Sequence, residues 1–208
     1  MLNRQFLQKI YDPVEKYGET RKFREKFLKD VKPTITDLSE LILKIFMFGK
    51  ESPGKKHFLK VTTTLVFKDH EKTTIGADLR KKDVEFKGCT LHIQVWSFNP
   101  TERSRSLFPM VVSGSVGGIF VYDITDEESL VFFEEYIKDV KLAASALGTI
   151  VIVGVNLSLE EHRQVPKEEA FEFYVNRGIR GDLVEIKSKK EQDLEKPFKI
   201  LCKKLFEV

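Results

Sequence analysis

LILKIFMFGKESPGKKHFLK, residues 41–60, predicts a strand, a loop and a helix. An apolar run rich in Ile and Phe ends at Gly49, the loop GKESPGKK follows, and an apolar pattern begins again at Phe58. Backbone N–H groups at a helix N-terminus bind anionic oxygens, and Gly49 and Gly54 would let the backbone approach them closely. Lys55 would reach the outer phosphates. These residues predict a phosphate-binding loop, and the alternative is an ordinary Gly/Pro/Lys turn between a strand and a helix.

The residue after Lys55 departs from the phosphate-loop pattern. G-x-x-x-x-G-K continues with Ser or Thr, whose hydroxyl holds a magnesium ion, whereas this chain has Lys56. A charged lysine has three donors and no lone pair, so Lys56 cannot ligate a metal. Two roles stay open for it: its ammonium replaces the ion, or it points to solvent or pairs with a carboxylate. We favour the second role.

The composition is that of a globular protein without a nucleic-acid signature. The 208 residues are 41% hydrophobic and 32% charged, and 35 basic against 32 acidic residues leave a net charge of +3. Cys89 and Cys202 predict reduced, buried thiols. No apolar run approaches the ~18–20 residues that span a bilayer, and no signal peptide or lipidation motif is visible. We therefore expect a cytoplasmic protein that does not bind nucleic acid, and peripheral contact with a membrane stays open.

The pattern of apolar residues predicts two parts, a helical extension with a linker over residues 1–40 and an α/β domain over 41–208. In the extension, apolar side chains recur at helical spacing, at Phe6, Ile10, Phe23, Phe27, Leu28 and Val31. This extension either packs on the domain or binds a membrane surface or a partner.

In the domain, β-branched runs alternate with helical patterns. We expect strands near 41–48, 77–86, 90–96, 117–125, 149–155 and 182–188, and helices near 55–67, 127–146, 167–176 and 191–206. That alternation predicts a doubly wound, mostly parallel six-stranded sheet flanked by helices.

Between residue 41 and about residue 206 the chain resembles the Ras superfamily of small GTPases, and the Rab branch most closely. TTIGADL at 73–79 is similar to the switch I segment, with Thr74 placed 19 positions after Lys55. Trp96 begins the expected switch II segment, in which Glu102-Arg103 match. Two further segments match, VYDITDEESL at 121–130 and LEEHRQVPKEEAFEF at 159–173. The resemblance implies a P-loop NTPase-like fold and assigns Thr74, Ile75 and Gly76 to switch I.

The same resemblance implies that the hydrolytic motif has changed. The family's D-x-x-G motif provides a magnesium carboxylate, a glycine N–H for the terminal phosphate and a following Gln that orients water. Ser97, Pro100 and Thr101 stand at those three positions. Proline has no N–H. We therefore expect no catalytic residue and no hydrolysis by the family mechanism, and Thr74 alone remains as a metal ligand.

The guanine-reading motifs differ as well. Val155, Asn156 and Ser158 stand where N-K-x-D would place its Asn, Lys and Asp, and the S-A-K motif is replaced around Ser188 and Lys189. Without the Asp, two charge-assisted hydrogen bonds to the base are lost, at about 1.5–3 kcal/mol each. We expect guanine specificity to be gone.

Two functions follow from this pattern. The first is a pseudoGTPase, a Rab-like domain without a nucleotide cofactor that binds a protein through its switch-like faces in trafficking or signalling. The alternative is a divergent GTPase that still binds GTP or GDP with Mg²⁺ through Gly49, Gly54 and Lys55 and hydrolyses slowly or with a partner's help. In a third interpretation, the N-terminal helices close the old nucleotide pocket. The sequence determines neither the partner nor the oligomeric state.

Overall fold

The computed structural model describes residue 22 and residues 42–66, 77–99, 105–147, 149–179, 181–186 and 191–206. The predicted extension over 1–40 therefore lies outside the described residues except for Lys22, which has helical backbone and an exposed side chain. No helix among the described residues combines the length and the apolar character needed to cross a membrane.

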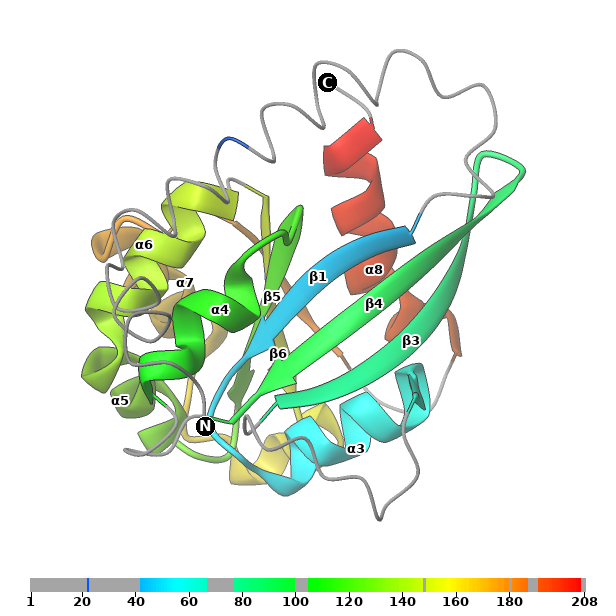
Figure 1. Ribbon diagram of the computed structural model, residues 1–208. Helices are drawn as coiled ribbons and strands as arrows, with labels where there is room; N and C mark the ends of the chain where they lie inside the picture. Colours follow the sequence, from blue (N-terminus) through cyan, green and yellow to red (C-terminus); the bar gives the residue numbers. More distant parts are fainter. Residues whose placement is uncertain are drawn as a thin grey trace.

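A single mixed sheet forms the centre of the molecule (Figure 1), with the strand order β2-β3-β4-β1-β5-β6-β7. The five strands from β4 to β7 in this order are parallel, and β3 pairs antiparallel with both β4 and β2. This confirms the doubly wound, mostly parallel α/β class. The strands are β1 Ile42–Phe48, β2 Thr64–Leu65, β3 Ala77–Phe86, β4 Cys89–Phe98, β5 Gly117–Asp123, β6 Ile150–Val155 and β7 Asp182–Glu185.

The sheet has one strand more than predicted, the two-residue β2. We expected the preceding helix to continue to about residue 67, but it ends at Thr62 because Thr63 has extended backbone, at φ −139°. The chain then pairs at once with β3, Leu65 lying opposite Arg80. Three consecutive β-branched threonines favour this change from helix to strand.

Helices cover both faces of the sheet. The predicted helix over 127–146 is in fact two helices that meet at Tyr136, where the backbone leaves helical geometry and the ring packs against Phe132 and Phe48. The helices are α3 Pro53–Thr62, α4 Phe108–Val112, α5 Glu128–Glu135, α6 Ile137–Leu147, α7 Lys167–Asn176 and α8 Glu191–Phe206, with 3-10 turns η2 Arg105–Leu107 and η3 Leu157–His162.

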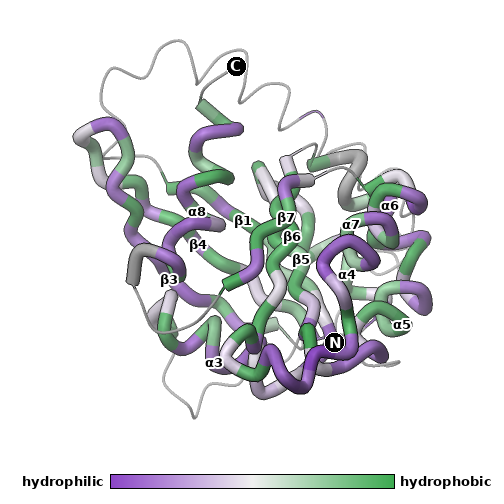
Figure 2. Tube along the Cα trace, turned by 180° about the vertical axis from the view of Figure 1, so that it is seen from behind, coloured by the Kyte–Doolittle hydropathy of each residue, from purple (hydrophilic) through white to green (hydrophobic). Residues whose placement is uncertain are grey.

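Two apolar layers hold the fold together. On one face, α4 to α7 pack on a cluster centred on Phe48, Phe120 and Phe133. On the other face, α3 and α8 pack on the alternate residues of the same strands, with Phe58 and Phe198 stacked on each other. Figure 2 shows the consequence, since hydrophobic colour follows the central strands whereas the surrounding helices alternate. The C-terminal ends of the central strands β1, β5 and β6 lie at the same end of the sheet, and the candidate site lies there.

Candidate functional site

The loop between β1 and α3, residues 49–56, is called the phosphate loop here. It ends in a regular helix start, in which Ser52 is the N-cap and Pro53 occupies the first turn. The Lys55 N–H donates to Ser52 Oγ at 3.1 Å, and the Lys56 N–H donates to the Ser52 carbonyl at 3.0 Å. Two backbone donors that could bind an anion are therefore already bonded within the loop.

Both glycines of the phosphate loop lie against neighbouring strands. A Cβ on Gly49 would come within 2.3 Å of the carbonyl oxygen of Val121 in β5. A Cβ on Gly54 would come within 2.7 Å of the side chains of Val155, the last residue of β6, and of Asn156, which follows it. Close packing therefore favours glycine at both positions, most strongly at Gly49, where the neighbour is a backbone atom.

Lys55 points back into the protein and is fully buried. Its ammonium donates to the Gly49 carbonyl at 2.7 Å, to the Phe98 carbonyl at 3.3 Å, and to Oδ1 of Asn99. An ammonium has three N–H donors, so all of its donors have protein acceptors. Sequence reasoning missed Asn99, which follows the end of β4 beside β1.

Burial is the main influence on the charge of Lys55. It lowers the pKa of this ammonium to about 8, and the nearby carboxylates of Glu51 and Asp78 oppose the decrease. The three direct acceptors of Lys55 are neutral oxygens. Because its pKa is about 8, Lys55 is mostly charged at neutral pH. Its ammonium is bonded to these neutral oxygens and not to a carboxylate.

The other two lysines of the phosphate loop pair with carboxylates on the surface. Lys50 donates to Asp126 at 2.9 Å and to Glu128 at 2.6 Å, joining the loop to the segment after β5. These hydrogen bonds, the one to Glu128 above all, raise the pKa of Lys50 against a smaller effect of burial. Lys56 is 69% exposed and pairs with Glu51 at 3.1 Å, which is the role that we favoured for it.

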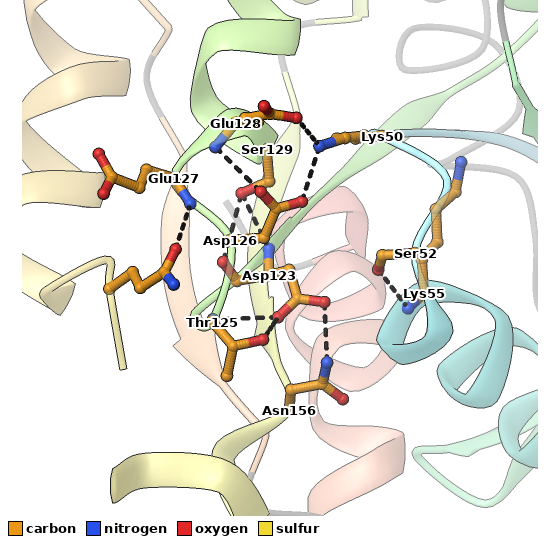
Figure 3. Close-up of polar contacts among 11 residues, drawn as sticks. Lys50, Ser52, Lys55, Asp123, Thr125, Asp126, Glu127, Glu128, Ser129 and Asn156 are labelled. Carbon is orange, nitrogen blue, oxygen red and sulfur yellow. Dashed lines mark hydrogen bonds and ion pairs between the residues drawn. The ribbon is translucent and has the colours of Figure 1, made fainter. Parts of the chain in front are cut away.

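A polar network lies beside the loop at the ends of β5 and β6 (Figure 3). The carboxylate of Asp123 accepts hydrogen bonds from the backbone N–H and hydroxyl of Thr125 and from Nδ2 of Asn156 at 2.8 Å. The Asp126 carboxylate accepts the Glu128 N–H at 3.1 Å. These carboxylates therefore stabilise turns, as their sequence context DITDEES indicates.

The base corner, residues 155–158, lines a small pocket with α3 and α8. Its volume is about 70 Å³, against the ~300–1,000 Å³ typical of ligand sites. Asn156 has left-handed backbone, at φ 68°, and its amide is used on Asp123. Most of the pocket wall is apolar, and its lining residues are Gly54, His57, Phe58, Val155, Asn156, Leu157, Ser158, Ile186 and Leu194.

Ser97 lies near the end of β4 and is 1% exposed. Its hydroxyl has no hydrogen-bond partner among the described residues. No group of three or more His, Cys, Asp or Glu side chains that could hold a metal ion occurs in the described part of the chain. The remaining predicted site residues, namely Thr74, Ile75, Gly76, Pro100, Thr101, Ser188 and Lys189, lie outside the described residues.

Sequence comparison agrees with this architecture. A model of the Ras family matches residues 44–207, which is more than half of the chain. The chain belongs to the Ras family.

Its relatives are Rab-like. It is 27% identical over 165 residues to the Ras-related protein Rab-25 of Bos taurus, covering 79% of this chain and 76% of that protein. It is 29% identical over 162 residues to Rab-13 of Bos taurus, covering 78% and 79%. The Rab-4 protein of Dictyostelium discoideum is 33% identical over 138 residues, covering 66% and 67%. This Ras-family chain is thus a Rab-like domain with a folded phosphate loop.

Proposed function

We propose that this Rab-like domain is a pseudoGTPase, a protein-interaction module whose nucleotide crevice is closed by its own side chains. The observation that carries the proposal is the set of three protein oxygens that accept the three donors of Lys55. A phosphate oxygen would have to displace one of them. Because the ammonium is fully buried, such an exchange would also have to disturb its packing.

The other described residues do not fit a guanine nucleotide with magnesium. The Ser52 cap occupies the Lys55 N–H, Pro53 has no N–H, and Glu51 adds a negative charge to the loop. Lys56 stands where the family pattern has a metal-binding hydroxyl, and Ser97 stands where it has a carboxylate for the magnesium ion. Neither residue provides the expected group. The base corner presents Ser158 and an apolar wall in a pocket of about 70 Å³.

The experiment that tests the proposal is an assay of bound nucleotide. The full chain is purified and denatured, the released nucleotides are separated, and the protein is titrated with GTP, GDP and ATP, with and without Mg²⁺. We expect no stoichiometric nucleotide and no binding at millimolar concentration. Stoichiometric guanine nucleotide would overturn the proposal.

A variant of Asn99 tests the mechanism directly. Asn99→Ala frees one donor of Lys55, so we expect inorganic pyrophosphate to bind the variant roughly tenfold or more tightly than the wild type, a change of about 1.4 kcal/mol. Calorimetry measures the two affinities. Asn176→Ala, at the exposed end of α7, is the matched control and is expected to leave the affinity unchanged. Equal affinity of wild type and Asn99→Ala would show that Asn99 does not compete with an anion.

The second candidate is a divergent GTP-binding protein. It is favoured by the strand–loop–helix geometry of residues 42–62, which brings Gly49, Gly54 and Lys55 to the crevice edge. In this case the nucleotide would have to draw the Lys55 ammonium away from Asn99. The nucleotide assay separates the two candidates, since only the second one predicts guanine nucleotide in the purified protein.

A further inference from the structure

One face of the sheet is open at the end where β1 begins. The strand register places Lys81, Gln94 and Lys44 in one row across this face, and Asp83, His92 and Ile42 in the next. In Figure 1 this part of β3, β4 and β1 faces the viewer, with α4 beside it and α3 and α8 behind. No described helix covers it, and the first residue of β1, Ile42, is 61% exposed.

The open face contains a groove lined by apolar and polar residues. Its volume is about 400 Å³, within the ~300–1,000 Å³ of ordinary binding pockets. Val66 is 45% exposed, and its N–H donates to the Leu79 carbonyl at 3.2 Å, so that it continues the sheet beyond β2. Four of the lining residues are apolar and four are polar or charged: Ile42, Val66, Leu79 and Ile93, and Lys81, Asp83, His92 and Gln94.

We propose that the chain's own residues 19–32 dock in this groove as an amphipathic helix. The segment joins the described domain at the groove itself, because Ile42 both begins β1 and lines the groove. Ile42 lies ten positions after residue 32, and ten residue steps reach at most about 33–36 Å when extended. Four neighbouring strands span only about 15 Å, so the segment can reach every part of the groove.

The chemistry of the segment fits this position. Its apolar side chains, Phe23, Phe27, Leu28 and Val31, are spaced to form one helical stripe. Lys22, the described residue just before this stripe, has helical backbone and is exposed, as expected on the polar side. The groove offers a partner layer for the stripe, because a helix on an open sheet face buries the apolar sides of both.

Tethering favours this occupant over a free partner or a second copy. A segment joined by a short linker has an effective concentration in the millimolar range, so a weak interface suffices to hold it. The groove lies at the beginning of β1, whereas the phosphate loop follows its end. This docking therefore differs from closure of the nucleotide crevice by the N-terminal helices, and it holds whether or not a nucleotide binds.

Hydrogen exchange of the full chain, followed by mass spectrometry, measures the docking. In the wild type we expect amides of residues 19–32 to exchange at least roughly tenfold more slowly than in an unstructured peptide. Val66→Asp, in the groove, should remove that protection. Val131→Asp is the matched control, because Val131 is 58% exposed on α5, away from the groove. Unprotected amides in the wild type, or protection that survives Val66→Asp, would overturn the proposal.

A photoreactive cross-linker at Phe27 identifies what the segment touches. Benzoylphenylalanine replaces this residue in the full chain, and the products are mapped after irradiation without nucleotide. Links within one chain to the groove residues, namely Ile42, Val66, Leu79, Lys81, Asp83, His92, Ile93 and Gln94, would support the docking. Links between two chains, or to α8 or the phosphate loop, would overturn it. Because the readout is independent of nucleotide binding, failure here would leave the pseudoGTPase proposal standing.

Discussion

The phosphate loop and the base corner lie at the same edge of the sheet but differ in how they depart from the family pattern. The phosphate loop retains Gly49, Gly54 and Lys55, and all three are held by neighbouring protein atoms. The base corner has different side chains at the pattern positions and forms only a small pocket. If the pseudoGTPase proposal holds, these three motif residues serve packing and not ligand binding. What the donors of a motif residue already bind must be known before a ligand is inferred.

The largest expected effect concerns Lys55, whose ammonium is buried and donates to protein oxygens. With a folded-state pKa of about 8 and an unfolded value near 10.4, the unfolded chain binds more protons between these values. The stability of the wild type relative to Lys55→Met should therefore rise by up to about 3 kcal/mol as the pH increases from 8 to 10.5. Urea unfolding over this pH range measures the difference.

The control for this experiment is Lys56→Met, whose side chain is 69% exposed. The stability difference between that variant and the wild type should not vary with pH in the same range. Cys202 is buried and its pKa is raised to about 12, so its titration lowers stability above pH 9, equally in all three proteins. A flat difference for Lys55→Met would contradict the internal position of this ammonium.

The second prediction concerns Gly49, which packs closely against Val121 of β5. Gly49→Ala would place a Cβ against the backbone oxygen of Val121, which cannot move without shifting β5. We expect the free energy of unfolding to fall by about 2–3 kcal/mol in nucleotide-free buffer. Chemical denaturation measures it.

Gly114→Ala is the matched control. Gly114 has positive φ, 74°, but open space around its Cβ position, so only the backbone conformation opposes the alanine. The expected loss is about 1 kcal/mol. A Gly49→Ala protein as stable as the wild type would remove the packing explanation and return this glycine to a ligand role.

The sequence predicts the fold well because the central strands are apolar runs that only a doubly covered sheet can bury. β5 and β6 were expected within two residues of their observed ends, and α7 and α8 at their observed bounds. The errors occur where tertiary contacts decide. The break between α5 and α6 depends on packing of the Tyr136 ring against Phe48, which is far away in the sequence.

The candidate site was predictable only in part, for a similar reason. The positions of Gly49, Gly54 and Lys55 in the loop follow from local spacing, and Ser52-Pro53 is a helix-start signal that could have predicted the cap. The contact of Lys55 with Asn99 joins residues 44 positions apart. It exists because β1 and β4 are parallel neighbours that end together, with Phe48 beside Phe98.

The smallest expected effect separates the two surface lysines of the phosphate loop. Lys50 bridges to two carboxylates of another segment and is 28% exposed, whereas Lys56 pairs only with Glu51 in its own loop. Lys50→Ala should lower the free energy of unfolding by about 1 kcal/mol at low salt, and Lys56→Ala by less than about 0.5 kcal/mol. The first loss should shrink in about 1 M NaCl, where the screening length is near 3 Å. Urea unfolding at both salt concentrations measures these differences. Equal, salt-independent losses would mean that the bridge from Lys50 to Asp126 and Glu128 does not hold the phosphate loop against β5.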